Sequence, residues 1–149
     1  MKVIVQNKKA FFDYEITYTV EAGIVLTGDE VKSLRALRGS LNGAFATVKN
    51  GEMFLLNSNI PLYSHAYTKD EDGATRTRKL LLKRGELNKL IGEISKKGMT
   101  ILPLKIYLNN RGLVKVELGV GKHRQAHNKK ELLKERDIAR DTRREMKNR

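Results

Sequence analysis

The chain has 149 residues and no cysteine, which excludes disulfide bonds, thiolate chemistry and cysteine-based zinc sites. Its 30 lysines and arginines outnumber 17 acidic residues, and the formal charge of +13 indicates a polyanionic partner, nucleic acid above all. No apolar run approaches the roughly 18 residues that a membrane-spanning helix needs and no signal-peptide pattern opens the sequence, so we expect a cytoplasmic protein without a membrane partner.

The positive charge is shared between a body and a polar tail. A body of about 120 residues can bury a core without a disulfide or metal staple, and we predict one domain over residues 1–119. Residues 120–149 are too polar to fold alone. From Gly121 onward the chain has 11 cations and 5 acids, so this tail carries +6 and leaves +7 to the body. Both parts can therefore attract phosphate.

The first predicted strand and helix follow one another closely. Around residues 16–20, apolar side chains alternate with threonines, which is the period of a strand with one buried face. A helix is predicted over residues 28–37, because Thr27 and Glu30 have the spacing of a capping box and Gly39 is placed to end it. Its small apolar face would consist of Val31, Leu34 and Leu37.

A hairpin and a second helix come next. Asn50-Gly51 suits a tight turn because both positions tolerate positive φ, so residues 44–56 are predicted to form a β-hairpin. From residue 87 to residue 94, leucines and isoleucines recur at i, i+3, i+4 and i+7, and Gly98 follows as a terminator. This pattern predicts a helix that packs on the core.

The last predicted element of the body is a second hairpin over residues 99–118, with its turn at residues 109–112. Pro103 lies inside its first strand and indicates either an edge strand or a bulge. Many short antiparallel strands with two short helices favour a small barrel that closes its own edges over a parallel α/β sheet.

Evidence for catalysis in the sequence is weak. Glu30 and Lys32, with Asp13 upstream, could form a metal-dependent nuclease site, but such triplets are common on ordinary helices and no second carboxylate cluster accompanies them. The three histidines lack the spacing of metal ligands on any firm element. We therefore expect no enzyme, no cofactor and no metal, with the nuclease kept as a minor alternative.

The densest cationic segment of the body is formed by Arg76, Arg78, Lys79, Lys83 and Arg84. On an extended segment Arg76 and Arg78 would face the same way, a geometry that suits two neighbouring phosphates. Ordinary solvated surface is the alternative. Only nine phenylalanines and tyrosines and no tryptophan are available for stacking, which favours recognition of folded RNA by its shape.

In the tail, the basic residues recur at a spacing that would gather them on one side of a helix. If residues 129–147 form a helix, five cations fall on one side, namely Lys129, Arg136, Arg140, Arg143 and Lys147. Such a stripe is suited to lie along a polyanion. The alternative is a solvated tail whose internal ion pairs keep it soluble.

Several stretches together resemble the bacterial SsrA-binding protein (small protein B) family. They are Asn7-Lys8-Lys9-Ala10, Glu21-Ala22-Gly23-Ile24, Glu30-Val31-Lys32-Ser33-Leu34-Arg35 and Arg76-Thr77-Arg78-Lys79-Leu80-Leu81-Leu82. The resemblance implies a small antiparallel barrel related to the OB fold, with flanking short helices and a tail that is disordered until it meets the ribosome. It also implies binding to the tRNA-like part of transfer-messenger RNA, placement of the tail in the decoding region of a stalled small subunit, and indirect contact with elongation factor Tu through the charged RNA.

The resemblance also implies site residues. Glu21 and Leu81 match the family's RNA-binding surface, with Asn7, Lys8, Lys32 and Arg35 near it, beside Arg76, Arg78 and Lys79 from the cationic segment. In the tail, His127, Lys129 and Lys130 match the family's decoding-centre signature, and Asn128 stands where the family has aspartate. The full set expected in the tail is Lys122, Arg124, His127, Asn128, Lys129, Lys130, Lys134, Arg136, Arg140, Arg143 and Lys147. A general structured-RNA or ribosome-binding protein is the main alternative.

Overall fold

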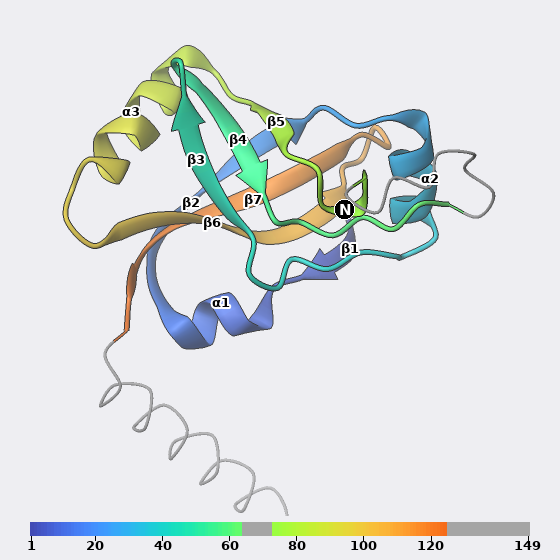
Figure 1. Cartoon of the computed structure of the whole chain (residues 1–149), viewed down its shortest axis with the longest axis horizontal. Coiled ribbons are helices and arrows are strands. Elements are labelled where there is room, and N and C mark those ends of the chain that lie inside the picture. Colours follow the sequence, from blue (N-terminus) through green and yellow to red (C-terminus); the bar gives the residue numbers. More distant parts are fainter. Residues whose placement is uncertain (64–72, 125–149) are drawn as a thin grey trace, which may run out of the picture.

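The computed structural model describes residues 1–63 and 73–124, which form seven strands, three α-helices and one 3-10 turn (Figure 1). In chain order these are β1 (Lys2–Gln6), α1 (Lys8–Asp13), β2 (Tyr14–Ile24), α2 (Gly28–Arg35), β3 (Phe45–Lys49), β4 (Glu52–Leu56), η1 (Gly73–Thr75), β5 (Arg78–Leu81), α3 (Arg84–Ile94), β6 (Met99–Leu108) and β7 (Val114–His123). Within the described ranges, no helix is long and apolar enough to cross a membrane.

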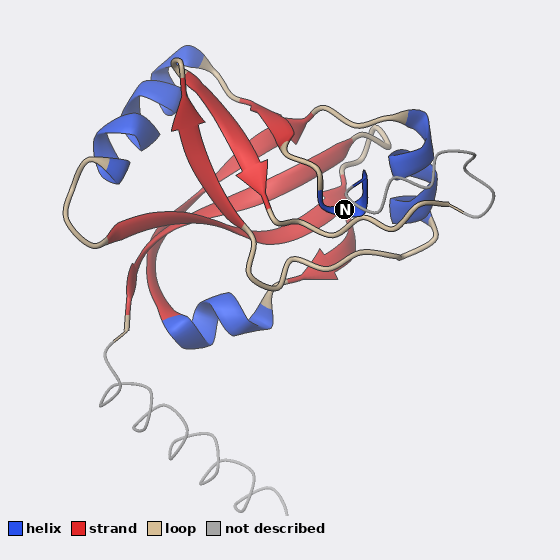
Figure 2. Cartoon of the chain, viewed as in Figure 1, coloured by secondary structure: helices blue, strands red, loops and turns tan. Residues whose placement is uncertain are grey.

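The strands form a closed antiparallel barrel. Hydrogen bonding follows the order β6-β3-β4-β5-β2-β7, and β7 then pairs with β6, which completes a ring of six strands. β1 adds to β6 outside this ring. Closure removes the unpaired edges of those six strands, and Figure 2 shows strands in the middle of the molecule with helices at its periphery. The predicted antiparallel barrel with flanking short helices is confirmed.

Both predicted hairpins are present. Asn50 and Gly51 form the turn between β3 and β4 with φ values of 53° and 75°, as a tight two-residue turn requires. In the second hairpin, β6 pairs with β7 and with β1 and β3, so it is not an edge strand. The register shifts between Pro103 and Lys105, so a bulge accommodates the proline. Of the two predicted alternatives, an edge strand or a bulge, the bulge is correct.

The capping box of α2 is confirmed, but the end of the helix differs from the prediction. α2 ends at Arg35, and Leu37 rather than Gly39 takes the left-handed position after it, with φ of 62°. The Leu37 N–H donates to the Leu34 carbonyl and the Arg38 N–H to the Ser33 carbonyl, which closes the helix in a Schellman motif. Leu37 is therefore 56% exposed, and its assignment to the apolar face was wrong.

Helices close the barrel interior and cover part of its outside. Leu34 of α2 and Leu90 of α3 are fully buried in the main core, and the two helices lie toward opposite ends of the barrel (Figure 1). The short helix α1, which was not predicted, packs Ala10 on Leu102 and Leu104 outside β6. Leu104 in turn packs closely on Gly119 of β7, where a Cβ would lie 2.7 Å from one of its methyl groups.

The last strand is longer than predicted. β7 runs to His123, and the Arg124 N–H donates to the Asp13 carbonyl at 2.8 Å. The predicted boundary between body and tail, after residue 119, thus falls inside β7, because the sequence pattern does not mark where pairing with β2 and β6 stops. Lys122 is an exposed residue of β7 rather than of a separate tail. Residues 125–149 lie outside the described residues.

Candidate nucleic-acid interface

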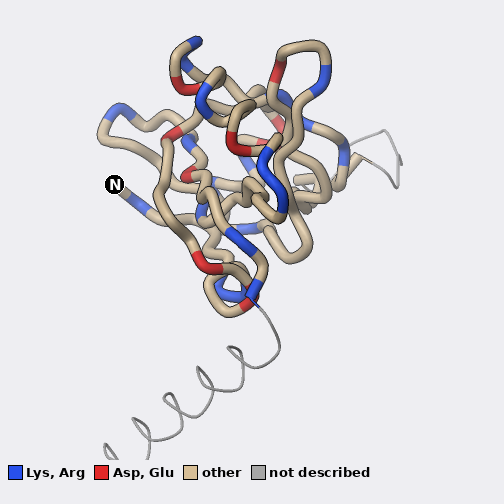
Figure 3. Tube along the Cα trace, turned by 90° about the vertical axis from the view of Figure 1, so that its left-hand side faces the viewer, with Lys and Arg blue, Asp and Glu red and all other residues tan. Residues whose placement is uncertain are grey.

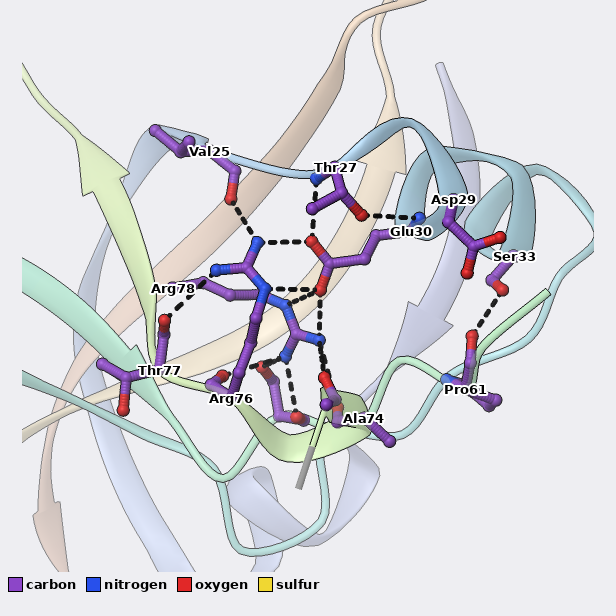
Figure 4. Close-up of polar contacts among 12 residues, drawn as sticks. Val25, Thr27, Asp29, Glu30, Ser33, Pro61, Ala74, Arg76, Thr77 and Arg78 are labelled. Atoms are coloured by element: carbon purple, nitrogen blue, oxygen red, sulfur yellow. Dashed lines mark hydrogen bonds and ion pairs between the residues drawn. The ribbon is translucent and has the colours of Figure 1, made fainter. Parts of the chain in front are cut away.

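The cationic segment at residues 76–79 does not form a surface patch. Arg78 is fully buried, and its guanidinium makes charge-assisted hydrogen bonds to a carboxylate and to backbone carbonyls (Figure 4). Its Nε donates to Glu30 Oε2 at 2.6 Å, one Nη to the Ser58 hydroxyl and carbonyl at 2.9 and 3.0 Å, and the other to the Ala74 carbonyl at 3.1 Å. The prediction that Arg78 binds phosphate was wrong, because its donors are used inside the protein.

Arg76 approaches the same carboxylate from a more exposed position. Its Nε donates to Glu30 Oε2 at 3.0 Å, and a second nitrogen pairs with Oε1. Arg76 and Arg78 do face the same way, as alternation predicted, but they converge on Glu30 and not on two phosphates. We call Glu30, Ser58, Arg76 and Arg78 the buried cluster.

Glu30 has no oxygen left for a metal ion. It is 3% exposed, and besides the two arginines its Oε1 accepts from the Thr27 backbone N–H at 2.8 Å. Burial alone would raise the pKa of the Glu30 carboxyl, but the hydrogen bonds from Arg76, Thr27 and Arg78 and the charge of Arg78 hold it below its ordinary value. The described residues contain no group of three His, Asp or Glu side chains placed to hold a metal. Nothing in this geometry favours the nuclease alternative.

Two other expected RNA contacts have structural partners. Asn7 is buried at the start of α1, where its side-chain oxygen accepts from the Ala10 N–H and its amide donates to the carbonyls of Leu41 and Pro103. Its assignment to the RNA-binding surface was wrong, because the N-cap bond uses the side-chain oxygen and the two carbonyls use the amide nitrogen of a buried residue. Lys79 is half-exposed and forms an ion pair with Glu52 at 3.2 Å on the neighbouring strand.

The register of four strands creates a continuous outer face on the barrel. One cross-strand row runs through Gln6 of β1, Lys105 of β6, Glu117 of β7 and Glu21 of β2. The next row runs through Tyr107, Lys115, Gly23 and Leu81, from β6 to β5. Residues two apart on a strand share a side, so both rows point outward together. We call this surface, with its eight residues, the outer face.

A cluster of polar contacts joins the first row to Tyr107 of the second row. The Tyr107 hydroxyl donates to the Glu21 carboxylate, and Lys105 forms an ion pair with Glu117 at 3.0 Å. Burial, the hydrogen bond to Glu21 and the charges of Glu21 and Glu117 raise the pKa of Tyr107, so its proton stays on the hydroxyl and continues to orient Glu21. We call Glu21, Lys105, Tyr107 and Glu117 the outer cluster. Glu21 remains exposed, so one of its oxygens can accept a further hydrogen bond from a ligand hydroxyl.

The second row opens into an apolar groove with a basic rim. Leu81 is 51% exposed and lies directly over Gly23, where a Cβ would come within 3.3 Å of the Leu81 Cβ. Val31, Leu113, Arg35 and Lys115 also line the groove. Sequence reasoning missed Lys115, although strand alternation from Glu117 places it on the same side. A half-exposed leucine between two cations provides an apolar contact flanked by phosphate-binding groups.

The structure places the remaining predicted residues as follows. Lys8 and Lys32 are exposed on α1 and α2, and Arg35 lines the groove beside Leu81. Arg124 is partly buried next to α1. Basic residues are spread along the trace in Figure 3, so charge alone does not locate the interface. Outside the described residues lie His127, Asn128, Lys129, Lys130, Lys134, Arg136, Arg140, Arg143 and Lys147.

Together, the closed barrel and its mixed polar, apolar and basic outer face define a small β-barrel protein with a surface suited to structured RNA. A family model described as SmpB protein matches residues 4–148, and the chain belongs to this family. The resemblance seen in the sequence motifs is confirmed.

Relatives and a solved structure agree with this assignment. The chain is 49% identical over 147 residues to an SsrA-binding protein of Thermosipho melanesiensis, covering 99% of each chain. It is 46% identical over 147 residues to an SsrA-binding protein of Coprothermobacter proteolyticus, covering 99% of this chain and 98% of the relative. A structure described as "tmRNA-SmpB: a journey to the center of the bacterial ribosome" contains a similar chain, with a TM-score of 0.67 and 46% identity over 81% of this chain and 84% of that one.

Proposed function

We propose that the chain binds the tRNA-like domain of transfer-messenger RNA (SsrA RNA) through the outer face and delivers it to stalled ribosomes during trans-translation. The observation that carries the proposal is the outer face itself, where Glu21, Leu81 and Lys115 lie side by side on adjoining strands. The names of the relatives and of the similar structure support the choice of RNA.

Each of these three residues has a distinct part in the proposed contact. Glu21, held by Tyr107, accepts a hydrogen bond from a ribose 2′-hydroxyl, which distinguishes RNA from DNA. Leu81 packs on a sugar or base of the minor groove. Lys115, with Arg35 across the groove, neutralises the flanking phosphates. The contact requires no catalytic group, so the chain acts as a binding factor and not as an enzyme.

The tail supplies the second half of the proposed function. Beyond β7, the tail includes the basic positions Arg136, Arg140 and Arg143, which enter the vacant decoding region of the small subunit. The protein reaches elongation factor Tu indirectly, through the charged RNA. A cytoplasmic location is part of this proposal, and action on the ribosome supports it. Changing these three arginines to glutamate should spare binding to free transfer-messenger RNA and abolish tagging of the stalled peptide. Equal losses in both assays would refute this separation of roles.

The test of the outer face is a comparison of two RNAs at about 0.2 M salt, where nonspecific phosphate binding is much reduced. The tRNA-like domain should bind much more tightly than a length-matched unrelated hairpin. Leu81→Ala should remove most of that preference, whereas Leu37→Ala, which removes another half-exposed leucine away from the outer face, should retain it. Equal affinity for the two RNAs would instead indicate a general structured-RNA-binding protein.

A further inference from the structure

The outer face continues past Lys105 to α1, where an aromatic side chain is exposed. A groove beside α1 is lined by Gln6, Lys8, Phe11, Lys105 and Glu117. Gln6, Lys105 and Glu117 belong to the first cross-strand row, so the groove adjoins Glu21 without a break. Phe11 is 48% exposed at its edge.

Exposure of one phenylalanine would not by itself indicate a site, since single apolar residues are common on protein surfaces. Here three further observations coincide with it. Two lysines, Lys8 and Lys105, line the same groove, and Lys105 is held there by its ion pair with Glu117 at 3.0 Å. α1 is held firmly, because Asn7 caps it with one hydrogen bond and anchors it with two more to the carbonyls of Leu41 and Pro103, and because Ala10 is buried. A rigid aromatic face beside cations is the arrangement by which proteins stack an unpaired base and hold its phosphate.

We propose that Phe11 stacks on an unpaired RNA base, with Lys8 and Lys105 contacting the phosphates next to it. The inference rests on the proposed function and extends it, because it assigns single-stranded or looped RNA to this end of the outer face. The ligand is therefore an unstacked nucleobase in a folded RNA, adjacent to the helical part bound around Glu21 and Leu81.

The chain provides a sensitive probe and a matched control. It has no tryptophan, so Phe11→Trp introduces a single tryptophan at the stacking position, whose emission is distinct from that of the five tyrosines. Phe45, 37% exposed, lies in a separate groove that also contains Lys9 and Asp13, on the other side of α1. Phe45→Trp therefore reports on an exposed aromatic residue close to the same helix but off the outer face.

The experiment titrates both tryptophan variants of the full chain with a transcript of the tRNA-like domain and with a continuous duplex lacking unpaired bases. We expect the transcript to quench the fluorescence of Phe11→Trp but not of Phe45→Trp, and the duplex to quench neither. Phe11→Ala should weaken binding to the transcript by roughly 5- to 150-fold, the range for one base–aromatic stack, and Phe11→Trp should restore it.

Three results would overturn the inference. Unchanged affinity in Phe11→Ala, with no quenching in Phe11→Trp, would show that the base does not stack there while RNA binding itself stands. A blue shift without quenching would indicate an apolar contact and not a base. If the unsubstituted chain bound no structured RNA, the proposed function would fail, and the stacking site with it.

Discussion

The buried cluster and the outer cluster both join carboxylates to donor side chains that are distant in the sequence. In the buried cluster, every oxygen of Glu30 is occupied by Arg76, Arg78 or the Thr27 N–H. In the outer cluster, Glu21 accepts from Tyr107 and remains exposed. The same kinds of side chain thus hold the fold together in one place and present binding groups in the other, and burial of the carboxylate decides between the two roles.

The largest expected effect comes from removing the buried charge. Arg78→Met leaves Glu30 with one partly exposed partner, and breaking a buried ion pair in this way should lower the free energy of unfolding by about 3–5 kcal/mol. Lys79→Met on the same strand is the matched control. Its pair with Glu52 is half-exposed, so urea denaturation should detect a change of less than about 1 kcal/mol.

The contrast between the two clusters also predicts that residues of the outer face determine RNA affinity without determining stability. Lys115→Met should leave the urea midpoint unchanged, because the side chain is a surface residue of β7, and should reduce the salt dependence of RNA binding by about one ionic contact. A fall in stability without a change in the salt slope would contradict the assignment of Lys115 to the outer face.

The buried cluster should also make the free energy of unfolding depend on pH. The pKa of Glu30 is lowered in the folded state, so its stabilisation is complete above the unfolded-state pKa of about 4.3 and is lost as the pH falls through the lower folded value. Glu30→Gln should be less stable at pH 7 and should flatten the loss of stability below about pH 4. Thermal unfolding across this pH range, with half-exposed Glu52→Gln as control, measures the effect. A variant with the slope of the unsubstituted chain would contradict it.

Local signals predicted the hairpins and the start of α2 correctly because their causes lie within a few residues. Asn50-Gly51 sets its own turn, and Thr27 and Glu30 cap their own helix. The role of Arg78 could not be predicted, since its partners Glu30 and Ser58 are 48 and 20 residues away along the chain. A dense run of cations specifies charge but not which side of a strand lies inside the barrel.

The outer face could likewise be predicted only in part, because contacts between distant segments assemble it. Glu21 and Leu81 came from a family resemblance, whereas Lys115 and Phe11 became visible only through the register of β7 and the groove beside α1. β1 and α1 were not predicted, because neither is marked by a turn signal like Asn50-Gly51 or by a capping box. Asn7, which stabilises α1, is bonded to carbonyls 34 and 96 residues away.

The smallest expected effect concerns the helix that joins the two regions. α2 contributes Glu30 to the buried cluster and Arg35 to the groove, and Leu37 follows it in the left-handed region. A leucine is strained there by about 1–2 kcal/mol, and glycine relieves the strain but loses more backbone entropy on folding, so Leu37→Gly should gain roughly 0.5–1 kcal/mol. Leu113→Gly is the control, because Leu113 is similarly exposed without positive φ and should lose stability.

Calorimetry of the two glycine variants measures this difference in stability. The RNA affinity of Leu37→Gly shows in addition whether Leu37 contacts RNA. Unchanged affinity would assign the strained leucine to the fold alone, in line with its position off the outer face. Weaker binding together with higher stability would extend the interface around the end of α2, so that Arg35 and Leu37 contact RNA together. A fall in stability for Leu37→Gly would contradict the strain argument, because the exposed side chain would then contribute more through its contacts than its backbone conformation costs.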